Sequence, residues 1–321
     1  MKLARILITG GSGFIGTNLS EQLRRDPSLT IANLDLAAPK LGAHAAFWQA
    51  QDVRSGNELT AALNTFRPDA VVHLAARTDL HGRGIGDYSS NTDGTSRLLE
   101  ALHEADFAGP AIFTSSMYVC RPGYQPVSDT DFQPHTIYGE SKVIGEQVVR
   151  AANPSYPWVI IRPTSIWGPW FGTPYADFFN IVLSGRYLHI SGNKTRKTYG
   201  YVGNTVAQIL TILNNASILR GRTFYLGDWP AYDIGEWADE IASFVPYMVP
   251  RVPKTLFEGL ALVGDTLQLV GVPFPMTSFR LRNLTTNNTH DLSPIQGLME
   301  NLPYTRVEGN RATVDWLKGN S

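Results

Sequence analysis

Thr9-Gly10-Gly11-Ser12-Gly13-Phe14-Ile15-Gly16 is the stretch that decides the fold of this chain. It completes an apolar run at Arg5 to Thr9 and leads into a helical pattern at Ile15 to Arg25. Glycines spaced three residues apart let the backbone turn sharply and approach a pyrophosphate, and the helix that follows offers free N–H groups and the positive end of its dipole. The stretch therefore predicts a dinucleotide-binding loop between a first strand and a first helix.

An acidic residue at the end of the second apolar run indicates which dinucleotide binds. Asp35 ends the run Thr30 to Asp35, about 20 residues beyond the loop, where a carboxylate hydrogen-bonds the ribose hydroxyls of the cofactor. The same carboxylate repels a 2′-phosphate, and the residues that follow, Leu36, Ala37 and Ala38, carry no cation to neutralise one. We therefore expect NAD rather than NADP.

Short apolar runs alternate with helical patterns through the first half of the chain. This alternation predicts an α/β fold, a doubly wound parallel sheet of the Rossmann type with a smaller C-terminal substrate-binding lobe. Prolines and glycines become frequent after Arg162, so we expect an NAD-binding domain at 1–165 and, at 166–321, mainly the substrate-binding lobe with some segments returning to the Rossmann core. The expected strands are Arg5 to Thr9, Thr30 to Asp35, Ala70 to Leu74, Ala111 to Ser115 and Trp158 to Arg162, and the expected helices are Ile15 to Arg25, Asn57 to Phe66, Thr95 to Ala105 and Tyr138 to Ala152.

The second lobe carries further helical signals. Val202 to Leu213 and Asp233 to Phe244 have helical patterns, and Asp233 and Glu236 have the spacing of a capping box. The most apolar stretch, Thr255 to Phe274, is interrupted by charged residues and does not match a membrane span. We favour a helix packed on the second lobe there. The alternatives are a lid over an apolar ligand and a surface that touches a membrane.

Composition excludes several classes of protein. The chain has 321 residues, 27 Lys and Arg against 28 Asp and Glu, and 43% hydrophobic residues, so it has neither the charge of a dedicated nucleic-acid binder nor the polarity of a disordered chain. Its single cysteine, Cys120, forms no internal disulfide and no paired-cysteine metal site. The apolar run Ile6 to Ile8 is too short for a secretory signal. We expect a cytoplasmic protein without a bound metal.

Tyr138-Gly139-Glu140-Ser141-Lys142 opens a helical pattern and places a phenol and an ammonium on one helix face. A phenol is a weak base at neutral pH, and a nearby ammonium favours its ionised form. Ser115-Ser116 ends a predicted strand at the edge of the sheet where α/β proteins bind ligands, and a serine there can orient a substrate oxygen while the tyrosine moves its proton. These residues predict hydride-transfer chemistry.

With the glycine loop, these residues resemble the extended short-chain dehydrogenase/reductase superfamily, in its NAD-dependent epimerase/dehydratase group. Further similar motifs are Asp52-Val53, His73-Leu74-Ala75-Ala76 and Asn91-Thr92-Asp93-Gly94-Thr95. The resemblance implies a catalytic trio of Ser116, Tyr138 and Lys142, and a homodimer formed near Thr95 to Ala105 and Tyr138 to Ala152. It implies NAD contacts by Gly10, Gly13, Phe14, Ile15, Gly16, Asp35, Asp52, Val53, Leu74, Ala75, Ala76, Asn91, Tyr138, Lys142 and Pro163. For His73 and Asn91 the alternative is a satisfied buried polar group, and for Cys120 a packing role.

Two features of the resemblance bear on the reaction and the substrate. Dehydratases of the family carry an acidic pair directly after the catalytic serine or threonine, where this chain has Met117 and Tyr118, so dehydration is disfavoured. Lys197, with Arg196 beside it, matches the place of an arginine that binds the diphosphate of sugar nucleotides; the alternative is a solvated basic pair. The segment that begins Arg162-Pro163 resembles 3β-hydroxysteroid dehydrogenases as well, and Ser165 within it stands where sugar-nucleotide epimerases usually have asparagine.

Three hypotheses follow. The first is an NAD-dependent nucleotide-sugar epimerase, or a related sugar oxidoreductase, that works through a keto intermediate with substrate contacts at Ser116, Ser165, Arg196 and Lys197. The second keeps this chemistry but takes a steroid-like or other lipid alcohol as its substrate. The third is an NAD-binding regulator without catalysis, which the intact serine, tyrosine and lysine disfavour.

Overall fold

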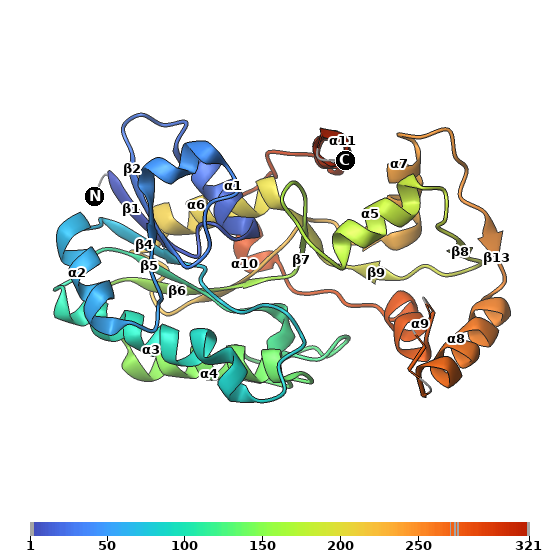
Figure 1. Ribbon diagram of the computed structural model, residues 1–321, viewed down its shortest axis with the longest axis horizontal. Helices are drawn as coiled ribbons and strands as arrows, with labels where there is room; N and C mark the ends of the chain where they lie inside the picture. The colour runs from blue at the N-terminus through green and yellow to red at the C-terminus, as the bar shows by residue number, and fades with distance from the viewer. Residues whose placement is uncertain (1–2, 270, 273, 275, 320–321) are drawn as a thin grey trace.

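The computed structural model describes residues 3–269, 271–272, 274 and 276–319. A parallel sheet with strand order β11-β6-β5-β4-β1-β2-β3 forms the centre of the first domain (Figure 1). This arrangement confirms the predicted doubly wound sheet. Its strands are β1 (Arg5–Thr9), β2 (Thr30–Asp35), β3 (Trp48–Ala50), β4 (Ala70–His73), β5 (Ala111–Thr114), β6 (Trp158–Pro163) and β11 (Thr223–Leu226).

Helices cover both faces of this sheet because alternate residues of each buried strand point to opposite sides. On one face Ile6 and Ile8 of β1 pack with α1 (Phe14–Leu23) and α6 (Val202–Asn215). On the other face Leu7 packs with α2 (Gly56–Phe66), α3 (Ser89–Glu104) and α4 (Ile137–Ala152). Short 3-10 turns lie at η1 (Gly42–Phe47), η2 (Ile85–Tyr88) and η3 (Met117–Val119).

The second lobe is built around a cluster of aromatic side chains. Trp167 and Trp237 are almost fully buried at its centre, with their ring centroids 5.1 Å apart. Its strands are β7 (Ser165–Trp167), β8 (His189–Ile190), β9 (Arg196–Lys197), β10 (Tyr199–Tyr201), β12 (Tyr232–Asp233) and β13 (Arg251–Val252). The remaining helices are α5 (Tyr175–Leu183), α7 (Ile234–Ala242), α8 (Lys254–Leu269), α9 (Ser278–Thr285), α10 (Ser293–Gln296) and α11 (Arg306–Gly319).

The expected strands all form, with ends that differ by at most one residue. Helix α3 begins at Ser89 rather than Thr95, because tertiary contacts stabilise its polar first turn; the Asn91 amide, for example, donates to Ser141 Oγ at 2.9 Å. Of the capping box before α7 the structure shows one half, in which Asp233 accepts from the N–H groups of Gly235 and Glu236.

The apolar stretch Thr255 to Phe274 forms helix α8 over most of its length, and positions 270 and 273 within it lie outside the described residues. Among the helices that the structure describes, none combines the length and the hydropathy needed to cross a membrane.

Candidate active site

The glycine loop between β1 and α1 has the shape that a pyrophosphate requires. Gly10 has φ +76°, and a side chain at this position would collide with the backbone of Ala75, which follows β4. Gly16 lies so close to the Gly10 carbonyl that a side chain there would collide as well. Asn33 of β2 stabilises the loop, because its Oδ1 accepts from the Gly11 N–H at 2.8 Å. The loop therefore presents its backbone directly to a ligand.

The first turn of α1 and the end of β2 complete the cofactor cradle. Helix α1 starts after Gly13 with no side-chain cap, so Phe14 and Ile15 begin a helix whose positive end is open to an anion. The carboxylate of Asp35 accepts from the N–H groups of Ser12 and Ala37, each at 2.9 Å, and these bonds fix it beside the loop. The residues fit NAD: a glycine cradle for the diphosphate and an acceptor for the ribose hydroxyls.

The other predicted cofactor residues line the same edge of the sheet. Leu74 and Ala75 follow β4 and bond to Thr9 through their N–H groups, at 2.8 Å to its carbonyl and 3.4 Å to its hydroxyl, and Ala76 comes next in the chain. Val53 is buried against α3. Asp52 forms an ion pair with Arg54 at 2.6 Å, and the hydrogen bond from Arg54 lowers the pKa of its carboxyl.

His73 and Asn91 are satisfied buried polar groups. The His73 ring lies 2.6 Å from Thr9 Oγ1 and 3.3 Å from Thr95 Oγ1, and burial lowers its pKa to about 3. The Asn91 side chain bonds both backbone groups of Arg77, at 2.8 and 2.9 Å, and thereby ties the loop after β4 to α3. A direct NAD contact by Asn91, and one by Pro163 at the end of β6, stay predictions.

The structure brings Ser116, Tyr138 and Lys142 together. Ser116 follows β5, and Thr136 caps α4 by accepting from the Gly139 N–H at 3.0 Å, which starts the helix directly before the tyrosine. Burial raises the pKa of Tyr138 to about 12, against a smaller lowering by its hydrogen bond with Ser116. Lys142 lies over the Tyr138 ring, with Nζ 6.0 Å from the ring centroid.

The position of the Lys142 side chain is fixed by a backbone carbonyl at the end of β5. The Lys142 ammonium donates to the Thr114 carbonyl at 3.0 Å, and Lys142 is only 6% exposed. Burial lowers its pKa to about 8, and the charge of Glu146 opposes that shift. Tyr138 and Lys142 are therefore two buried groups with shifted pKa values in contact with each other, a combination that marks a candidate functional site.

Met117 and Tyr118 form one wall of the site. The Tyr118 ring meets the Tyr138 ring edge-on at 5.7 Å and stacks on His135 at 5.5 Å. Met117 Sδ lies 3.9 Å from Ser165 Oγ and 3.9 Å from Asn288 Nδ2. The positions that follow Ser116 thus hold a thioether and a phenol, as the sequence indicates, where a dehydratase needs carboxylates.

The predicted substrate residues have different surroundings. Ser165 Oγ accepts from the Tyr175 hydroxyl at 2.7 Å and lies beside Met117. Lys197 donates to the Asn283 carbonyl at 2.6 Å, and burial lowers the pKa of its ammonium to about 8. Arg196 is exposed, and neighbouring residues of a strand point to opposite faces. The structure therefore does not hold Arg196 and Lys197 as one basic pair.

Asn288 is a site residue that sequence reasoning missed. It follows α9, and its Oδ1 accepts from the Gly123 N–H at 3.1 Å while its amide reaches Met117. Its only sequence signal is a polar Asn287-Asn288 pair, which carries no motif.

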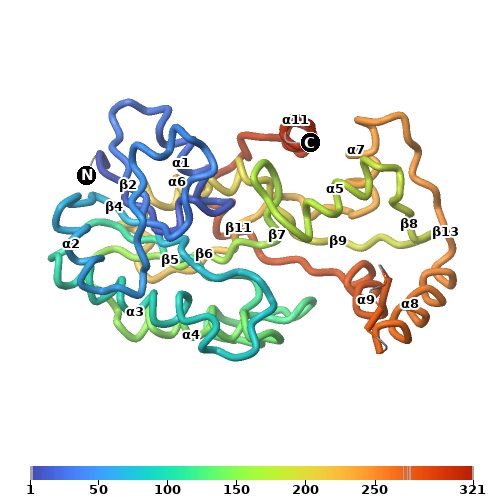
Figure 2. The backbone as a smooth tube through the Cα atoms, viewed as in Figure 1, coloured from blue at the N-terminus to red at the C-terminus, as the bar shows by residue number. Residues whose placement is uncertain are grey.

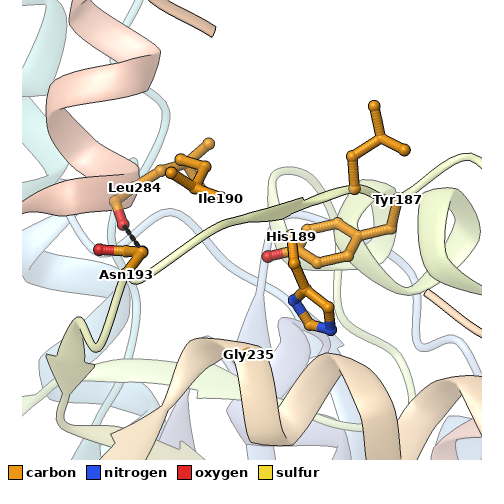
Figure 3. A pocket seen from close by; sticks show the side chains of 7 residues that line it. Tyr187, His189, Ile190, Asn193, Gly235 and Leu284 are labelled. Atoms are coloured by element: carbon orange, nitrogen blue, oxygen red, sulfur yellow. Dashed lines mark hydrogen bonds between the residues drawn. The ribbon is translucent and has the colours of Figure 1, made fainter. Parts of the chain in front are cut away.

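A small cavity in the second lobe lies apart from these residues (Figure 3). It is lined by Tyr187, Leu188, His189, Ile190, Asn193, Gly235 and Leu284. His189 Nε2 lies 2.7 Å from an oxygen of Asp239. None of the predicted catalytic residues lines it. In the part of the chain that the structure describes, no cluster of three or more His, Cys, Asp or Glu could hold a metal ion.

Known proteins resemble this chain in sequence and in fold. The model of the NAD dependent epimerase/dehydratase family matches residues 6–227. A 3-beta-hydroxysteroid dehydrogenase of Mycolicibacterium neoaurum is 26% identical over 78% of this chain and 72% of its own length. The N-acetyl-alpha-D-glucosaminyl-diphospho-ditrans,octacis-undecaprenol 4-epimerase of Escherichia coli O157:H7 is 28% identical over 97% of this chain and 94% of its own. Among solved structures, the UDP-glucose 4-epimerase of Thermus thermophilus in complex with NAD superimposes with a TM-score of 0.71 at 21% identity, covering 99% of this chain and 100% of that one.

Proposed function

Because the chain belongs to the NAD-dependent epimerase/dehydratase family, we propose that it epimerises a diphosphate-linked sugar through a keto intermediate. The observation that supports the proposal is that Ser116, which follows β5, hydrogen-bonds Tyr138 on α4, and that Lys142 lies over the Tyr138 ring. Bound NAD supplies the acceptor and donor of hydride.

The side chains divide the proton chemistry among them. The Tyr138 oxygen takes the proton of a sugar hydroxyl as the carbinol carbon is oxidised, and Ser116 Oγ holds the same oxygen. Burial disfavours the phenolate that this step needs, and the Lys142 ammonium over the phenol ring acts in the opposite direction by attracting its negative charge. The aromatic wall of Tyr118 excludes water, so the ketone stays in place until it is reduced on the opposite face.

The substrate class rests on the relatives and on the sequence together. A sugar diphosphate is common to the nucleotide sugars that the sequence predicts and to the lipid-linked sugar named for the epimerase that matches nearly the whole chain. Exposed Arg196 is the cation that we propose for the diphosphate, since Lys197 is engaged with Asn283.

The test is mass spectrometry of the small molecules released when the purified protein is denatured, followed by assays without added cofactor. Near-stoichiometric NAD and interconversion of two epimers support the proposal. Release of NADH in step with product indicates a dehydrogenase instead. If Tyr138→Phe does not abolish the turnover, the assignment of the trio is wrong, and absence of any turnover in the wild type favours the NAD-binding regulator.

A second candidate, oxidation of a 3β-hydroxysteroid or another lipid alcohol, is favoured by the Mycolicibacterium relative and by apolar side chains on α8 and α9. A lipid alcohol carries no diphosphate. Arg196→Ala should raise KM for a sugar diphosphate at least several-fold and leave KM for a sterol unchanged, so this variant separates the candidates. The homodimer and the cytoplasmic location stay predictions.

A further inference from the structure

The pair of helices α8 and α9 projects from the second lobe, away from the main sheet (Figure 1). One side of this α8/α9 hairpin is fixed to the protein. Phe257, Ala261 and Leu281 are buried there with Ile190 of β8. Polar contacts add to this: Asn193 Nδ2 donates to the Leu284 carbonyl at 3.1 Å (Figure 3), and Lys197 donates to the Asn283 carbonyl.

Several large apolar side chains of the hairpin lie outside this core and are exposed to solvent. Leu269 is 88% exposed, Leu262 69% and Phe279 68%. Leu256 and Val263, seven residues apart and so on one side of α8, are each 50% exposed. We name this surface the hairpin face and define it by Leu256, Leu262, Val263, Leu269, Val272 and Phe279. A surface helix normally has apolar residues only on the side that faces the core. Because α8 also has apolar residues on its exposed side, we expect that side to contact a second apolar surface outside the protein.

Charge at the hairpin favours an anionic partner. Residues 251–285 carry four basic side chains, Arg251, Lys254, Arg280 and Arg282, against two acidic ones, Glu258 and Asp265. This segment thus has a formal charge of +2 in a chain whose net charge is -1. Long basic side chains around an apolar helix face suit the boundary between lipid headgroups and acyl chains.

We propose that the hairpin face docks the protein on the surface of a bilayer that contains anionic lipids. Its apolar side chains enter the acyl boundary, while Arg251 and Arg282 meet the headgroups; Lys254 instead pairs with Glu258 at 3.2 Å. A second copy of the chain is not the occupant that we assign. The helices expected to form a dimer, α3 and α4, belong to the other domain and lie far from the hairpin (Figure 1).

Docking has a consequence for the active site. The chain after α9 runs back from the hairpin toward the sheet (Figure 2), and three residues beyond the helix Asn288 contacts Met117, the neighbour of Ser116. When the hairpin is docked, the bilayer therefore lies on the side of the protein where the segment after α9 approaches Met117. This part of the inference rests on the proposed function. The orientation suits a sugar diphosphate whose carrier lipid remains in the membrane.

Flotation with vesicles tests the docking without turnover, so its failure and a failure of the proposed function are distinguishable. Vesicles of phosphatidylcholine and phosphatidylglycerol in equal parts should carry the wild-type protein, and vesicles of phosphatidylcholine alone should carry much less. The triple variant Leu262→Ser, Leu269→Ser and Phe279→Ser should lower the partition coefficient by about tenfold or more. Arg251→Gln with Arg282→Gln should lower it by about fivefold for each charge, on the anionic vesicles only.

Matched controls come from apolar residues exposed elsewhere. Val127 is 92% exposed and Ile218 78%, and the double variant Val127→Ser, Ile218→Ser should float like the wild type. An environment-sensitive dye on Leu269→Cys should shift its emission to the blue with vesicles, whereas the same dye on Val127→Cys should not; Cys120 is buried and leaves the label specific. Failure of the wild type to float, equal flotation of the triple variant, or a solution dimer that the triple variant dissociates would each overturn the proposal.

Discussion

Arg162 and Glu146 form a bidentate ion pair inside the first domain, with Nε 2.7 Å from Oε1 and Nη2 2.9 Å from Oε2, and both side chains are 1% exposed. Arg162 Nη2 also donates to the Asp129 carbonyl at 2.6 Å. Glu146 lies one turn after Lys142 on α4, where its charge acts on the lysine ammonium. The pair thus joins the end of the central sheet to the helix that carries the tyrosine and the lysine.

Breaking this pair should be costly because it leaves one buried charge without its partner. We expect Glu146→Gln and Arg162→Met each to lower the free energy of unfolding by about 3–5 kcal/mol. The double variant should recover part of that loss. Urea unfolding of the two single variants and the double variant measures the coupling.

The exposed pair Arg97–Glu100, at 2.7 Å, is the matched control. Glu100→Gln should change the free energy of unfolding by at most about 1 kcal/mol, since solvent screens both charges. Equal losses for Glu100→Gln and Glu146→Gln would contradict the role assigned to burial.

Removal of the Tyr138 hydroxyl should stop the chemistry without emptying the cofactor site. We expect Tyr138→Phe to lower kcat by about 10²–10⁴-fold, the range of general acid–base catalysis, and to leave NAD affinity within a few-fold of the wild type. Ser116→Ala should have a smaller effect, because serine only positions the substrate oxygen. Single-turnover kinetics with calorimetry of NAD binding checks both parts, and a parallel fall in NAD affinity would point to misfolding of the site.

Asp35 should set the preference for NAD over NADP. Asp35→Asn removes the charge that repels a 2′-phosphate and keeps one side-chain oxygen, which can accept from either the Ser12 or the Ala37 N–H group but not from both. We expect weaker binding of NAD and a smaller ratio between the affinities for NAD and NADP. Fluorescence titration with both cofactors measures the ratio, which should stay at the wild-type value in Asp52→Asn.

His73 should make the fold sensitive to acid. Its pKa falls from 6.5 to about 3 on folding, so across this window the unfolded chain binds a proton that the folded protein does not. Stability should therefore fall as the pH falls through the window. His73→Gln cannot titrate and should lose less stability than the wild type between neutral pH and the lower end of the window. Burial also lowers the pKa of His290, to about 4, so the stability of the variant should still depend on pH, but less steeply than that of the wild type. An unchanged slope in urea unfolding would refute the assignment.

Much of the first domain followed from local signals. The glycine spacing before α1, the β-branched residues in each of the five predicted strands and the Tyr138–Lys142 spacing are each complete within a few residues, whereas β3, with the sequence Trp-Gln-Ala, and β11 were not predicted. Local sterics and periodicity act over the same distance, which is why these elements could be predicted almost to the residue. The polar first turn of α3 was missed because its stability comes from Ser141 on another helix.

By itself, the sequence determined the NAD-binding sheet, the tyrosine and lysine on one face of α4 and the absence of carboxylates directly after Ser116. Only the tertiary structure decided that Asn288 reaches Met117, that Lys197 is engaged with the Asn283 carbonyl, that Glu146 pairs with Arg162, and that the apolar residues of α8 divide between a buried side and an open one. Asn288 and Met117 are 171 residues apart in the chain. Such contacts depend on how whole elements pack, and no local pattern of residues encodes that packing.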